Sequence, residues 1–157
     1  MGVSGAGKTA IGEALARELG WRFLDADDYH PPANIAKMAA GQALDDEDRK
    51  PWLEKLNHEL WKLDASDESV VLACSALKER YRRQLSAGIP RIEWVYLKGD
   101  FDLIHSRLAK RRHRYMPASL LQSQFAALEP PQRAIAVDVS ADIAACVAAI
   151  AAQLKAG

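Results

Sequence analysis

Short apolar runs alternate along this chain with longer stretches in which apolar residues recur at helical spacing. The short runs predict strands at 21–25, 69–74, 92–97 and 135–139. The run from Ser69 to Cys74 is continuous, which is typical of a strand buried on both faces. The alternation of strands with helices predicts an α/β fold, in which βαβ units build a parallel sheet with helices on both faces.

The longer stretches predict helices with one apolar face. Ile11, Leu15 and Leu19 recur every four positions, which predicts a helix over 8–19 that Gly20 ends. A leucine stripe at positions 53, 56, 60 and 63 predicts a second helix, with Asp45 or Asp48 as its cap. Further helices are predicted over 31–40, 76–85, 101–112 and 117–128 and along the stripe at 143–154.

Composition narrows the class of protein. The 157 residues fit one domain spanning 1–157, and 49% of them are hydrophobic, enough for one substantial core. The 21 basic and 21 acidic residues cancel, which argues against a nucleic-acid partner. There is no membrane-spanning apolar run or signal peptide, and Cys74 and Cys146 are expected to be free buried thiols. We therefore expect a cytoplasmic location and no membrane partner.

A glycine-rich loop opens the first helix and predicts a nucleotide-phosphate site. Its spacing is G-x-x-x-x-G-K-[ST], which lets successive backbone N–H groups converge on phosphates at the positive end of a helix. Lys8 is expected to reach the β- and γ-phosphates, and the Thr9 hydroxyl to bind Mg²⁺. The loop comprises Gly2, Val3, Ser4, Gly5, Ala6, Gly7, Lys8 and Thr9.

Two acidic residues stand at the carboxyl end of the next predicted strand, where open α/β sheets bind ligands. Alternation along an extended segment puts Asp25 and Asp27 on the same side. We assign Asp25 to the metal's shell through water, and Asp27 to orienting or deprotonating an acceptor hydroxyl. The alternative is an acidic turn that is merely solvated.

Several further side chains are candidates for contacting an anionic acceptor. His30 is expected to hydrogen-bond a hydroxyl, although a plain turn histidine explains it almost as well. Lys78 and Arg82 are four residues apart, after the buried strand, and are expected to hold an anion with Arg49. The alternative for these three is an exposed charged helix surface.

Arginines also cluster after the fourth predicted strand. Arg107 and Arg111 share a helix face and are expected to bind ATP from a lid, with Arg112 and Arg114 close by. A nucleic-acid patch is the weaker alternative, given the balanced charge. Trp52, Trp61 and Trp94 are expected in the core.

With these motifs in place, the sequence resembles the bacterial-type gluconokinase family, which is related to the shikimate kinases and nucleoside monophosphate kinases. The resemblance covers essentially the whole chain. Its most specific blocks are Asp48-Arg49-Lys50-Pro51-Trp52-Leu53 and Cys74-Ser75-Ala76-Leu77-Lys78, and the stretch from Ser119 to Phe125 adds to it.

The resemblance implies the P-loop kinase fold, a three-layer sandwich around a five-stranded parallel sheet, and commonly a homodimer. It also implies ATP-dependent phosphorylation of D-gluconate at its terminal hydroxyl, giving 6-phosphogluconate. A substrate-binding helical insertion is expected at about 31–66, and a lid at about 111–128.

The sequence departs from the family pattern at two places. The lid carries His113 one place ahead of the family's usual position. The strand that normally feeds the glycine loop is largely missing, because the loop begins at Gly2, and we expect the working protein to begin upstream.

Two competing functions stay open at this point. One is a kinase for another small anionic hydroxy compound. The other is a non-catalytic nucleotide-binding module, against which the joint presence of Lys8, Thr9, Asp27 and Lys78 argues.

Overall fold

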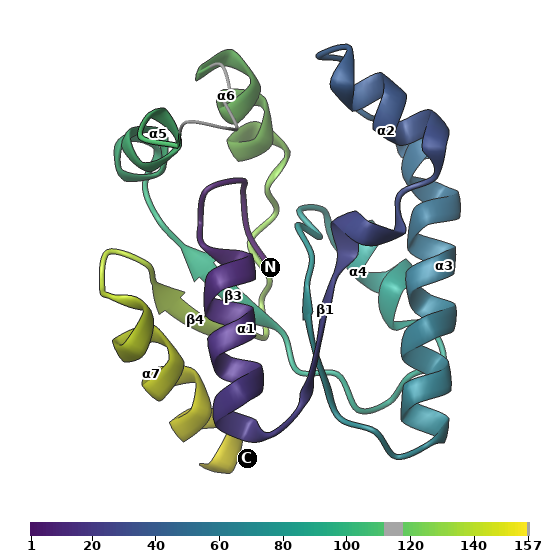
Figure 1. Cartoon of the computed structure of the whole chain (residues 1–157), viewed down its shortest axis with the longest axis vertical. Helices are drawn as coiled ribbons and strands as arrows, with labels where there is room; N and C mark the ends of the chain where they lie inside the picture. Colours follow the sequence, from purple (N-terminus) through teal and green to yellow (C-terminus); the bar gives the residue numbers. More distant parts are fainter. Residues whose placement is uncertain (112–117, 157) are drawn as a thin grey trace.

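The computed structural model describes residues 1–111 and 118–156, which form short parallel strands flanked by helices (Figure 1). The predicted lid residues 112–117, His113 among them, lie outside the described residues. In chain order the elements are α1 (Lys8–Leu19), β1 (Arg22–Asp25), a 3-10 turn η1 (Ala26–Tyr29), α2 (Pro32–Ala39), α3 (Asp46–Ala65), β2 (Val70–Ala73), α4 (Glu79–Ser86), β3 (Val95–Lys98), α5 (Phe101–Ala109), α6 (Ala118–Ala127), β4 (Ile135–Asp138) and α7 (Ile143–Ala156).

The strands form two parallel pairs instead of one continuous sheet. Strand β1 pairs with β2, with Arg22 opposite Val70, and β3 pairs with β4, with Val95 opposite Ile135. Met1 and Gly2 lie between the pairs. The Met1 amino group donates to Val95 O (2.5 Å) and Met1 O accepts from Leu97 N (2.9 Å), while Gly2 N donates to Ser75 O (3.2 Å). These two residues thus form one rung of parallel ladder between β2 and β3.

Beyond that rung, β2 and β3 face each other across an apolar cavity of about 350 Å³. The described residues therefore form four strands in two pairs, whereas a five-stranded sheet was predicted. The cavity also explains why Val70, Val71 and Leu72 are only half-buried, although the apolar run predicted burial on both faces.

Two hydrophobic clusters cover the two faces of the strand layer. On one face α1 and α7 pack side by side, and Ile11, Leu15 and Ile150 join Leu97 and Val137 of the strands (Figure 1). On the other face, side chains of α3 and α4 meet those of β2 and β3; they include Trp52, Leu53, Leu56, Tyr81 and Leu85. The predicted three-layer arrangement is thereby confirmed.

A few local predictions need correction. Helix α4 begins at Glu79 instead of Ala76, because Ala76 has a φ of +44°, which no right-handed helix accommodates. Trp61 was predicted in the core, but it is 52% exposed, because it lies beside the leucine stripe instead of on it. Both cysteines are free and buried, as predicted. No helix of the described residues is long and apolar enough to cross a membrane.

Candidate active site

The glycine loop wraps the start of α1 and borders a cavity of about 650 Å³. Gly5 and Gly7 have φ values of +83° and +92°, the left-handed region that glycine adopts at least cost. At Gly5 a Cβ atom would come within 2.7 Å of the Leu108 side chain. This backbone turns Gly7 into the N-cap of α1, so the loop amides gather at the positive end of that helix.

Lys8 follows the loop and bends back over it. Its ammonium group donates to Val3 O (2.9 Å) and lines the cavity. Burial lowers the pKa of Lys8, while the carboxylates of Asp27 and Asp25 oppose this shift. A charged lysine within a loop of N–H groups is suited to binding phosphate oxygens.

Thr9 and Asp25 bring two oxygen ligands together across the cavity floor. The Thr9 hydroxyl donates to Asp25 Oδ2 (2.9 Å), and Asp25 Oδ1 accepts from Asp27 N (3.0 Å). A hydroxyl next to a carboxylate is the oxygen chemistry that Mg²⁺ prefers, with water and phosphate completing its shell. The described residues contain no cluster of three or more His, Cys, Asp or Glu side chains able to hold a metal by themselves.

Asp27 and His30 lie along the same wall of the cavity. Asp27 has an exposed side chain, and its Oδ1 is 3.8 Å from His30 Nε2. The His30 ring stacks on Trp52 with 4.3 Å between ring centroids, and the Trp52 indole is held by Ala26 O (2.7 Å). Burial lowers the pKa of His30, although Asp27 raises it, so His30 is neutral at pH 7.

Buried Asn34 fixes the orientation of that imidazole, and it is a residue that the sequence reasoning missed. Its amide nitrogen lies 3.4 Å from His30 Nδ1 and donates to Asp48 O (2.9 Å). An amide donor at Nδ1 leaves the proton of the neutral ring on Nε2, which faces Asp27. His30 therefore presents an N–H to the cavity.

Positive charge also gathers at the cavity, where Arg49 and Lys78 both line it. Their cationic groups lie over the buried ring of Tyr81, at 5.3 and 5.7 Å from its centroid. Asp46 stands beside them, accepting a hydrogen bond from the Tyr81 hydroxyl. Sequence reasoning missed Tyr81 and Asp46, because only the fold brings the starts of α3 and α4 together.

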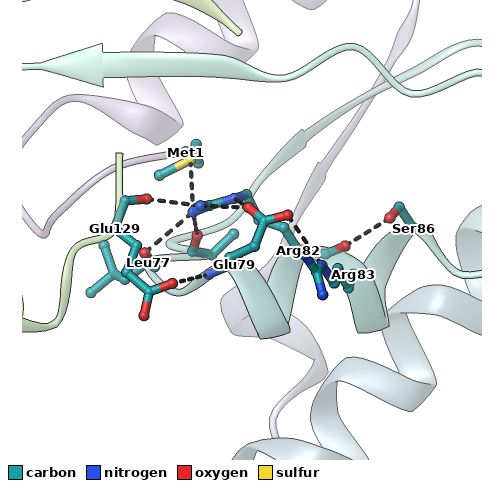
Figure 2. Close-up of polar contacts among 8 residues, drawn as sticks. Met1, Leu77, Glu79, Arg82, Arg83, Ser86 and Glu129 are labelled. Carbon is teal, nitrogen blue, oxygen red and sulfur yellow. Dashed lines mark hydrogen bonds and ion pairs between the residues drawn. The ribbon is translucent and has the colours of Figure 1, made fainter. Parts of the chain in front are cut away.

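Arg82 does not reach this cavity, contrary to the sequence prediction. Its guanidinium is buried and donates to the carbonyls of Ala76 (2.8 Å), Leu77 (3.2 Å) and Glu129 (2.8 Å), and it pairs with Glu79 (Figure 2). The i, i+4 spacing failed because Lys78 precedes the first turn of α4 and caps it from an extended conformation. Arg82 instead holds in place the loop that carries Lys78.

The two arginines predicted to bind ATP from a lid are also separated. Arg111 lines the cavity, whereas the Arg107 guanidinium donates to Val139 O (2.5 Å) and lies outside it. A residue that sequence reasoning passed over, Gln124 of α6, reaches the glycine loop instead. It accepts from Ser4 N (2.8 Å) and donates to Ser4 Oγ (3.2 Å).

Comparison with known proteins identifies close relatives of this chain. The shikimate kinase family profile matches residues 4–139. The chain is 45% identical over 148 residues to the thermosensitive gluconokinase of Escherichia coli (strain K12), covering 92% of this chain and 79% of that protein. It is 40% identical over 161 residues to the thermoresistant gluconokinase of the same organism, covering 100% and 92%.

Solved structures agree with these sequence matches. A gluconokinase from Sinorhizobium meliloti 1021 superposes with a TM-score of 0.90 at 43% identity, covering 99% of this chain and 89% of that one. The shikimate kinase from Aquifex aeolicus, at 17% identity and a TM-score of 0.58, shares the fold.

Proposed function

Because this chain belongs to the gluconokinase family, we propose that it transfers the γ-phosphoryl group of ATP to the terminal hydroxyl of D-gluconate, giving 6-phosphogluconate. One observation carries the proposal beyond the family match. A single cavity of about 650 Å³ is lined by the glycine loop, by Arg49 and Lys78, and by Asp27. We call the part at the glycine loop the nucleotide end and the part at Arg49 and Lys78 the acceptor end. That one cavity holds a phosphate-binding loop together with cations suited to an anionic acceptor supports the proposal.

The nucleotide end supplies positioning and charge. Backbone N–H groups of residues 2–9 and the ammonium of Lys8 bind the β- and γ-phosphates, and Arg111 adds positive charge from the lid side. Thr9 and, through water, Asp25 would hold Mg²⁺, which would neutralise charge on the phosphates. These groups orient the γ-phosphoryl group toward the acceptor with no covalent step from the protein.

The acceptor end orients the hydroxyl that attacks. Arg49 and Lys78 bind the carboxylate of gluconate, and His30 donates to one of its hydroxyls. Asp27 orients the terminal hydroxyl and accepts its proton as the oxygen bonds to phosphorus and ADP leaves. Its partner across the cavity is Lys8, with which it interacts favourably.

An acceptor panel tests this function. Coupled ADP release is measured with ATP, Mg²⁺ and each of gluconate, shikimate and nucleoside monophosphates. We expect turnover with gluconate at least tenfold above every other acceptor. Preference for another acceptor would show that the chain is a kinase for that compound. ATP binding without acceptor-dependent turnover would show that it is a non-catalytic nucleotide-binding module.

The homodimer and the cytoplasmic location stay predictions that rest on family resemblance and composition. Light scattering during size-exclusion chromatography tests the first, with a mass of twice 17.3 kDa expected. Fractionation of cells that express the protein at its native level tests the second.

A further inference from the structure

One acidic residue stands among the cations of the acceptor end. Asp46 is the first residue of α3 and lines the cavity together with Arg49 and Lys78. Its carboxylate accepts a hydrogen bond from the Tyr81 hydroxyl and forms a direct ion pair with Arg80. Lys78 Nζ lies farther from it, at 3.9 Å. Asp46 therefore pairs mainly with Arg80, and the N–H donors of Lys78 stay available to a bound anion.

The ring of Tyr81 holds the surrounding cations in place. It is 5% exposed, and the guanidinium carbons of Arg49 and Arg80 lie 5.3 and 5.5 Å from its centroid. Lys78 Nζ lies 5.7 Å from the same centroid. Cations at this distance from an aromatic ring are attracted to it, so the ring of Tyr81 attracts all three positive groups. The Tyr81 hydroxyl donates a hydrogen bond to Asp46, which holds the carboxylate beside these cations.

The cluster carries a net positive charge. Three cations and one carboxylate leave a formal net charge of +2, and Arg80, which lies nearer to Asp46 than Lys78 does, does not line the cavity. The Tyr81 hydrogen bond, followed by Arg80, Lys78 and Arg49, lowers the pKa of Asp46, so this carboxylate is charged at neutral pH. Of the neighbouring acids, Asp45 also lines the cavity, but both Asp45 and Asp48 pair with Lys37, and Glu79 pairs with Arg82 and Arg83.

We propose that Asp46 is a specificity-determining residue that disfavours an acceptor head group with two negative charges relative to a head group with one. The inference rests on the proposed function, because it concerns the end of the cavity that binds the acceptor's anion. Asp46 reduces the positive potential that Arg49 and Lys78 present to the head group. Its repulsion acts twice as strongly on the two charges of a phosphate ester as on the single charge of a carboxylate, and Arg80 does not line the cavity, so it does not bind the added charge. The enzyme would thus distinguish sugar acids from sugar phosphates.

Two acceptors that differ in their head group test the proposal. Gluconate carries a carboxylate and sorbitol 6-phosphate carries a dianionic phosphate, and each has a primary hydroxyl at its other end. The selectivity is the KM for gluconate divided by the inhibition constant of sorbitol 6-phosphate competing with it. For Asp46→Asn we expect selectivity to shift toward the phosphate by about fivefold or more, the effect of one charge several ångströms away.

Matched variants separate charge from structure. Glu47→Gln removes the same charge from the next residue, which is exposed and does not line the cavity, and is expected to change selectivity less than twofold. Asp46→Glu keeps the charge and should retain the original selectivity. Arg80→Gln removes the partner of Asp46 and should shift selectivity the opposite way, toward gluconate, which tests the proposal even where Asp46→Asn does not fold.

An unchanged selectivity in folded Asp46→Asn, or in Arg80→Gln, would overturn the proposal, as would an equal shift in Glu47→Gln. The wild-type protein is assayed first with gluconate. Absence of gluconate turnover there counts against the proposed function, whereas turnover with unaltered selectivity in the variants counts against the role of Asp46 alone.

Discussion

At the residue scale, the cavity wall between donor and acceptor is built on Asp27 and His30. Asp27 follows the last residue of β1 by two positions, and its backbone N–H is fixed by Asp25. His30 is held by stacking on Trp52 and by Asn34. Sequence spacing placed Asp27 and His30 near the site, but the stacking partner and the amide that sets the tautomer come from α3 and α2. Such contacts between helices have no signature in a single sequence.

Substitution Asp27→Asn tests the assignment of the acceptor's proton. We expect kcat to fall roughly a hundredfold to ten-thousandfold, because a positioned base is lost, while the KM for ATP changes little. The pKa of His30, measured by NMR titration, should fall further below its ordinary value of 6.5, since Asp27 currently raises it. A kcat near wild type would remove Asp27 from the mechanism, and an unmoved His30 pKa would contradict the contact.

At the element scale, most helices were predicted from apolar spacing, and the failures cluster around the loop after β2. Ala76 adopts a left-handed conformation, so α4 begins three residues later than predicted. The Arg82 side chain therefore binds buried carbonyls and does not line the cavity. The carbonyls that Arg82 binds belong to residues 76, 77 and 129, and the last of these lies 47 residues farther along the chain. A pattern of charges four apart predicts a helix face but not which residue begins the helix.

Substitution Arg82→Ala tests the structural role of this arginine. We expect the free energy of unfolding to fall by about 3 kcal/mol or more, because three carbonyls lose a buried charged donor. The KM for gluconate should rise more than the KM for ATP, since the loop carries Lys78. Urea unfolding and steady-state kinetics measure the two effects.

The neighbouring Arg83 provides the control for this substitution. Its side chain is 79% exposed and pairs only with Glu79 among the described residues, so Arg83→Ala should change stability by no more than about 0.5 kcal/mol. Equal effects of the two substitutions would show that position on α4, and not the buried hydrogen bonds, determines the loss.

At the scale of the whole molecule, the two strand pairs are joined through Met1 and Gly2. The alternation of strands and helices predicted the layers and the parallel direction, but the division into two pairs could not be read from the apolar runs. A run such as Val70–Ala73 is apolar whether its open edge faces another strand or a cavity.

The lowered pKa of His30 makes stability depend on pH. Below its ordinary pKa of 6.5 the unfolded chain binds a proton at His30 more readily than the folded chain does, so the free energy of unfolding rises with pH toward neutrality. Urea unfolding at pH 5.5 and 8.0 measures this rise. Stability that is flat or falling over this range would contradict the burial of the imidazole.

In the proposed function, one cavity joins an ATP phosphate site to a gluconate site. The most direct test is ³¹P NMR of the purified protein with ATP, Mg²⁺ and gluconate, beside an identical sample of Lys8→Ala. We expect the wild type to convert the γ-phosphate signal into one phosphomonoester signal split by two methylene protons, with ADP in equal amount, and Lys8→Ala to show no such conversion. Release of inorganic phosphate alone, a phosphomonoester at a secondary hydroxyl, or full conversion by Lys8→Ala would contradict it.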